Sequence, residues 1–137
     1  MTFAKNFFTT PSLEAEFGVI LNRDINPELA SFKYILESID SIYPLIEIHN
    51  LIFYGDEPHG AELLANNAIH AGVILGPKNK VPKNKIETDL KLNYDQEIVD
   101  TWNNKILPSD ILSQVTWLIN EKVRNNNIIR KGNLILT

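Results

Sequence analysis

The sequence lacks several features that would point to particular classes of protein. It has no cysteine among 137 residues, which excludes disulfides and thiolate chemistry and fits a reducing, cytoplasmic setting. No apolar run is long enough to span a bilayer, so no membrane partner is expected. Residues 1–10 lack the extended apolar core of a secretory signal. A net charge of -4 argues against a general nucleic-acid binder.

What remains is the composition of an ordinary folded domain. The hydrophobic fraction of 44% is typical of a globular protein, and the length suits one domain with a real core. We expect residues 1–12 to form a lead-in segment and residues 13–137 to form the domain itself.

The first periodic stretch, Leu13–Leu21, predicts a strand because its apolar residues alternate with other residues. In that strand Glu14, Glu16 and Gly18 share one face, and the glycine is expected to leave open space beside the carboxylates. Two like charges this close repel unless a cation or a proton holds them. The pair is therefore a candidate site for a hard metal ion with oxygen ligands. The alternative is a solvent-facing strand that carries glutamate for solubility.

The next segments predict a helix and a second strand. Apolar residues at helical spacing indicate a helix over residues 28–40, and Pro44 is expected to follow its end. Leu45–Asn50 then predicts a strand with Glu47 and His49 on one face. A carboxylate in such an apolar run is unusual, because charged groups are rarely buried without a partner. The alternative is that Glu47 lies on a wet face or pairs with a distant lysine or arginine.

The rest of the chain predicts more strands and one clear helix. We expect a buried strand at 68–76, a β-hairpin at 86–93 and 96–102, a helix with Ser109 as N-cap that ends at residues 125–127, and a paired last strand at 134–136. Mostly β elements with two helices favour an α+β fold with a mixed or rolled sheet.

Five segments of the chain, taken in order, carry a resemblance to a known family. The segments are Glu14–Asp24, Tyr43–Asn50, Ala65–Gly76, Val115–Asn120 and Lys131–Thr137. They are similar to segments of the 2-keto-4-pentenoate hydratase group of the fumarylacetoacetate hydrolase superfamily. The last of them, Lys-Gly-Asn-Leu-Ile-Leu-Thr, resembles the family's terminal Ala-Gly-Asp-Ile-Ile-Leu-Thr-Gly strand. The matches are colinear from about residue 13 to the end of the chain.

The resemblance implies a fold and a chemistry. The fold is a mixed β-roll of the fumarylacetoacetate hydrolase C-terminal type with flanking helices. The site is a Mg or Mn ion held by residues at the positions of Glu14, Glu16 and Glu47. In the family the metal chelates a small 2-oxo acid, so the implied activity is that of a metal-dependent, hydratase-like lyase.

The chain also departs from the family pattern. The family's N-terminal region has no counterpart, so the domain is expected to be truncated, and Asn50 stands where the family has aspartate. His49 and His70 are candidate catalytic acid–base groups or additional ligands. The alternative for His49 is a half-buried ring bonded to the backbone. Asn67 matches the family's asparagine in the third segment and is a candidate substrate-binding residue.

Two functions follow from this pattern. The first is an active lyase, which the three acidic positions favour. The second is a catalytically inactive remnant that acts as a binding module or a partner subunit, which the shortened chain and Asn50 favour. In either case we expect exposed apolar surface, and hence a homo-oligomer or a complex with a full-length relative.

Overall fold

The computed structural model describes residues 5–56, 58–125 and 127–137. Three parts of the chain lie outside the described residues. They are residues 1–4 of the expected lead-in, Glu57, and Asn126, which belongs to the segment where the last helix was expected to end. The strands are β1 (Pro11–Leu21), β2 (Ile39–Asn50), β3 (His70–Leu75), β4 (Ile86–Tyr94), β5 (Glu97–Leu107) and β6 (Leu134–Leu136). The helices are α1 (Phe32–Ser38), α2 (Ala61–Ala65) and α3 (Ser109–Arg124), with 3-10 turns η1 (Lys5–Phe7), η2 (Pro27–Leu29) and η3 (Asn67–Ile69).

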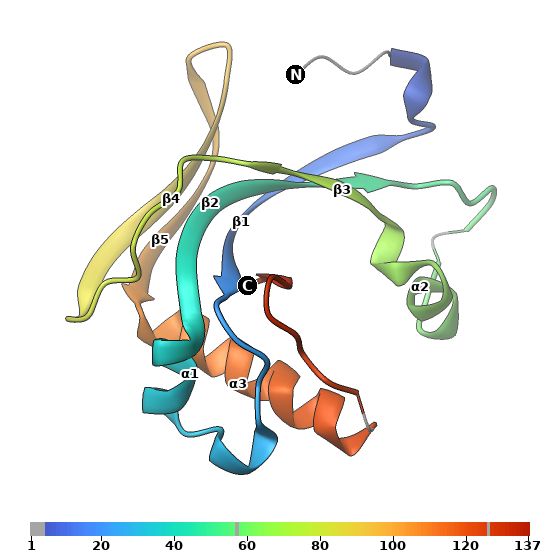
Figure 1. Ribbon diagram of the computed structural model, residues 1–137. Coiled ribbons are helices and arrows are strands. Elements are labelled where there is room, and N and C mark those ends of the chain that lie inside the picture. Colours follow the sequence, from blue (N-terminus) through green and yellow to red (C-terminus); the bar gives the residue numbers. More distant parts are fainter. Residues whose placement is uncertain (1–4, 57, 126) are drawn as a thin grey trace.

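Four strands form a curled sheet in the order β3-β2-β1-β6, and β4 and β5 form a separate two-stranded hairpin. The α+β class is confirmed, and Figure 1 shows α1 and α3 together below the lower ends of β1 and β2, with α2 near β3. Every pairing among the described strands is antiparallel, so the expected mixed sheet is not found there. The roll itself stays a prediction.

The core lies where β1, β2 and β6 meet α3. The helix buries Ile111, Leu112, Val115 and Ile119, which recur at helical spacing as the sequence predicts. They pack with side chains from the lower part of the sheet, including Val19, Leu21, Ile39, Ile42 and Ile135. The last strand pairs with β1, as expected, and the core therefore closes around the C-terminal segment.

The expected helix over residues 28–40 is too long. Only Phe32–Ser38 is α-helical, and β2 begins at Ile39 rather than at Leu45. The apolar residues at 35 and 39 fit a helical period, but from Ile39 onward the side chains alternate and the chain pairs with β1. Pro44 therefore lies inside β2, where its carbonyl oxygen still accepts a hydrogen bond from Gly76 N at 2.8 Å.

The other expected boundaries agree more closely with the structure. The hairpin is confirmed, with its turn at Asp95 and Gln96, whose positive φ angles suit the right-handed twist of the strands. The helix α3 starts at Ser109 itself, and Asp110 Oδ2 accepts a hydrogen bond from Ile106 N at 2.8 Å. The strand expected at residues 68–76 starts at His70, because residues 67–69 form a 3-10 turn. The expectation that this strand is buried was wrong: β3 lies at the edge of the sheet, and none of its residues is buried. No helix of the described residues is long and apolar enough to cross a membrane.

Candidate functional site

The strand pair β1–β2 brings two of the predicted ligands face to face. Glu14 lies directly opposite Glu47 in the antiparallel register, so the two side chains project from the same face. Glu16 and His49 lie on that face too, two residues along their own strands. Like charges directly across a strand pair are destabilising, so this end of the sheet carries an electrostatic cost.

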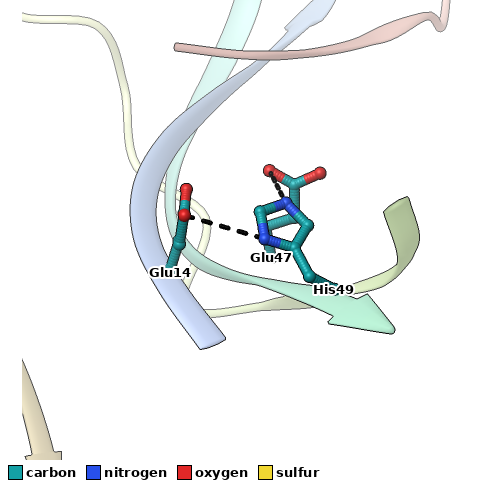
Figure 2. Close-up of side chains that lie close together, drawn as sticks. All are labelled: Glu14, Glu47 and His49. Carbon is teal, nitrogen blue, oxygen red and sulfur yellow. Dashed lines mark ion pairs between the residues drawn. The ribbon is translucent and has the colours of Figure 1, made fainter. Parts of the chain in front are cut away.

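The His49 ring lies between the two carboxylates, as Figure 2 shows. Its Nδ1 is 3.7 Å from Glu14 Oε1, and its Nε2 is 3.4 Å from Glu47 Oε2. The side chains of His49 and Glu47 are only 12% and 14% exposed, whereas that of Glu14 is 56% exposed. Among the described residues the ring contacts carboxylates and makes no hydrogen bond to backbone, so the backbone-bonded alternative is not found.

A second histidine reaches the cluster from the neighbouring strand. His70 begins β3 and pairs with His49 across a register shift. Its Nδ1 lies 2.5 Å from Glu47 Oε1, within hydrogen-bond distance of that carboxylate oxygen. Glu47 is thus neither on a wet face nor paired with a lysine or arginine, because its partners are two histidines.

Glu16 carries an unusual buried atom. Among the described residues, its Oε2 is the buried side-chain oxygen without a hydrogen-bond partner. Burial raises the pKa of the Glu16 carboxyl, and the charges of Glu47 and Glu14 raise that pKa further. A carboxylate that is partly desolvated, repelled and unpartnered is the kind of group that a cation or a proton satisfies.

The donor set fits a divalent cation. Glu14, Glu47 and His49 each offer one atom, and these three atoms lie within 4.8 Å of one another. Glu16 lies outside that group, although its orphaned oxygen belongs to the same face and feels the same charges. Carboxylate and imidazole are both common ligands of divalent metals. The structure thus brings Glu14 and Glu47 together from two strands, along with His49, which the sequence had indicated as a candidate additional ligand or acid–base group.

The space expected beside the carboxylates is absent. A Cβ built on Gly18 would lie 2.4 Å from Leu45 Cδ2 and 3.0 Å from Leu134 Cδ1. The glycine therefore admits the side chains of β2 and β6 and leaves no opening for a ligand. This expectation was wrong because β6, far along the sequence, pairs with β1 at that point.

Asn67 and Asn50, which the sequence analysis also named, make no described contact with the side chains of this cluster. Asn67 is exposed in η3 and has a positive φ of 50°, as do the next two residues. Asn50 has a structural role that the sequence did not indicate, because its Oδ1 accepts hydrogen bonds from Thr9 N and Thr10 N at 2.8 and 3.1 Å. A contact across forty residues leaves no local signal in the sequence.

Comparison with known proteins gives a consistent result. No family model matches the chain. The chain is 27% identical over 132 residues to the 2-keto-4-pentenoate hydratase of Paraburkholderia xenovorans and equally so to 2-keto-4-pentenoate hydratase 3 of Pseudomonas putida. Each match covers 93% of this chain and 48% of the relative, so the chain spans about half the length of the curated relatives it matches.

A solved structure shares the fold. The 4-oxalocrotonate decarboxylase from Pseudomonas putida G7, complexed with magnesium and adipate, superposes with a TM-score of 0.79 at 19% identity. The match covers 95% of this chain and 50% of the decarboxylase. These relatives carry the names of enzymes, which does not favour the inactive remnant. The comparisons confirm the predicted resemblance: the chain is similar to 2-keto-4-pentenoate hydratases over about half of their length and shares the fold of half of the 4-oxalocrotonate decarboxylase.

Proposed function

We propose that the cluster on β1 and β2 holds a divalent cation, Mg or Mn, and forms part of a hydratase-like lyase site for a small 2-oxo acid. Glu14, Glu16 and Glu47 are the proposed carboxylate ligands. A bound cation would supply Lewis-acid polarisation of the 2-oxo group and charge neutralisation. The observation that carries the proposal is the buried, unpartnered Oε2 of Glu16 beside a cross-strand pair of glutamates.

The roles of the other residues follow from their positions. His70 holds Glu47 through a short contact and fixes the orientation of that carboxylate. His49, next to both glutamates, is the proposed group that holds or moves a proton during the reaction. Asn67, which is exposed at the start of the segment leading to His70, is proposed to contact the substrate.

A negatively charged 2-oxo acid would be repelled by three carboxylates alone. The proposal therefore requires that metal and acid bind together, with the metal between the acid and the protein. Because the matched relatives are about twice as long, we also propose that a second copy or a full-length relative completes the substrate pocket.

The test is turnover of a 2-hydroxydienoate, measured as the loss of the ultraviolet absorbance of this substrate. The chain is assayed alone and mixed with a full-length relative, with Mg or Mn and with chelator. We expect metal-dependent turnover that Glu47→Gln abolishes, whereas the exposed control Glu28→Gln retains it. The mixture is also assayed with a relative inactivated at its own site, so that any turnover comes from this chain.

The outcomes separate the two functions. Metal-dependent turnover lost in Glu47→Gln supports the lyase. Metal binding measured by calorimetry without turnover in either setting supports the inactive binding module instead. Absence of any metal binding overturns the proposed site, because the three carboxylates would then have no cation to share.

A further inference from the structure

The strand β6 has one edge that pairs with no described strand. It ends the sheet order β3-β2-β1-β6, so only its other edge pairs, and that edge pairs with β1. Phe17 N donates to Thr137 O at 3.3 Å, and Thr137 N donates to Phe17 O at 2.7 Å. Backbone groups alternate in direction along an antiparallel strand. The N–H and C=O groups of Leu134 and Leu136 therefore point away from β1, in position to pair with an added strand.

A groove runs between β6 and the helix α3, which lies below the red C-terminal segment in Figure 1. Two neighbouring hollows of about 380 and 260 Å³ form it, and both are lined by Leu118 and Ile135. Trp117 lines the larger hollow and is 65% exposed. The larger hollow lies beside Leu136 and the smaller one beside Leu134, so the groove follows the whole strand. Because side chains alternate along a strand, a strand added to β6 would place every second side chain in this groove.

The groove carries positive charge at one end. Among the described residues that line the two hollows, Lys122 is the charged one, and it lies in the smaller hollow together with Asn133 and Leu134. This sign is opposite to the net charge of the chain, which is -4. The Lys122 end of the groove is therefore complementary to an acidic group on a bound segment, whereas the rest of the groove offers apolar side chains and short polar ones.

We propose that this groove binds an extended peptide segment of a partner protein, which adds an antiparallel strand to β6. The segment has apolar residues at alternate positions and an acidic residue toward its C-terminal end, where it passes Lys122. Main-chain hydrogen bonds to Leu134 and Leu136 supply affinity, and the groove selects the alternate side chains. The antiparallel direction is the more stable one per residue and is the direction of every described pairing in this sheet.

This inference goes beyond the proposed lyase and does not depend on it. Val19 packs in the core with α3, on the side of β1 that faces the groove. Glu14 and Glu16 are an odd number of residues from Val19, so they project from the opposite face of the strand. A peptide bound beside α3 would leave the carboxylates free, and failure of either proposal would leave the other intact.

The experiment uses the full chain and a fluorescently labelled peptide, acetyl-Thr-Val-Thr-Val-Thr-Glu-amide, whose valines would face α3. Binding is measured by fluorescence anisotropy at low salt, and the oligomeric state of the chain is measured by sedimentation velocity. A second peptide ends in lysine instead of glutamate. A third is N-methylated at its threonines, whose N–H groups would face β6. We expect the glutamate peptide to bind about threefold tighter than the lysine peptide, and the N-methylated peptide not to bind.

Variants of the chain locate the bound peptide. Trp117→Ala should weaken binding about tenfold, because exposed aromatic side chains dominate such contacts, whereas Tyr94→Ala, which removes another exposed aromatic on the hairpin, should leave it unchanged. Lys122→Glu should reverse the preference, so that the lysine peptide binds tighter than the glutamate peptide. Lys83→Glu is the matched control, because Lys83 is exposed in a loop outside the groove. Circular dichroism establishes that each variant is folded.

The outcomes decide the inference. Loss of binding on N-methylation and in Trp117→Ala, together with the reversed preference in Lys122→Glu, supports it. Equal binding of the N-methylated peptide would show that no strand is added, and an unchanged preference in Lys122→Glu would show that the acidic residue does not lie there. If no peptide binds and the chain sediments as a dimer that Trp117→Ala dissociates, a second copy occupies the groove instead. If no peptide binds a monomeric chain, the groove does not take a peptide.

Discussion

Replacing Glu16 with glutamine should make the metal-free protein more stable. The carboxylate of Glu16 has one buried oxygen without a partner and is repelled by Glu47 and Glu14. Glutamine has nearly the same shape and removes the charge. Glutamine still places a polar atom at the buried position, so the gain comes from removing a partly desolvated and repelled charge; because water still reaches part of this side chain, we expect a gain of about 1 kcal/mol.

That free energy translates into a measurable change in melting temperature. The entropy of unfolding of a 137-residue domain is roughly 0.3 kcal/mol per kelvin, so a gain of about 1 kcal/mol raises the melting temperature by about 3–4 °C. The assay is thermal unfolding in chelator at pH 7.5, followed by circular dichroism. Glu14→Gln is the matched control; that carboxylate is 56% exposed and should shift the melting temperature by less.

The pH dependence gives an independent check of the same reasoning. Because the pKa of Glu16 is raised in the folded state, its contribution favours folding at low pH and is lost as pH rises through the folded pKa. The advantage of Glu16→Gln should therefore be largest at pH 7.5 and should shrink toward pH 4.5, where the native carboxyl takes up its proton. The reasoning is refuted if the variant is no more stable than the native chain at pH 7.5, or if its advantage does not fall with pH.

Three further changes test the fold around the site. Gly76→Ala would place a Cβ 2.7 Å from the carbonyl oxygen of Pro44, and because backbone yields less than a side-chain tip, we expect a loss of about 2 kcal/mol by urea unfolding. Asn50→Ala removes the acceptor of two amides of the N-terminal segment, so that segment should be cleaved faster in limited proteolysis while the cleavage rate in α3 stays unchanged. Ile35→Ala truncates a fully buried side chain and should cost about 2–5 kcal/mol in the same urea assay, whereas truncation of the exposed Ile128 should cost far less.

The sequence predicted best the elements in which period and burial agree. The strand β1 and the helix α3 each show one clear period, and both lie where expected. The start of β2 was missed because the apolar residues from Ile35 to Ile39 satisfy a helical period up to the residue at which strand pairing takes over. Pairing with β1 decides this boundary, and pairing depends on residues far away in the sequence.

In the candidate site, too, the local pattern could be predicted from the sequence, whereas the pairing between distant strands could not. Alternation alone placed Glu14 and Glu16 on one face of their strand, and Glu47 and His49 on one face of the next strand. This follows because side-chain direction in a strand has a period of two. That these two faces are the same face depends on the register between β1 and β2, which no short motif specifies. The contact between His70 and Glu47 depends likewise on the register of β3.

The strand pair β1–β2 has two ends of very different character, and this should govern how it opens. The Val19–Leu21 end is buried in the core, while the Pro11–Glu14 end is exposed and carries facing negative charges. Amide hydrogens at the buried end should exchange only on global unfolding, and those at the charged end through local fraying. A cation bound at the charged end would join β1 to β2 there and reduce the local fraying of the strand pair. Its first signature would be slower amide exchange around Glu14, spreading from the site toward the core.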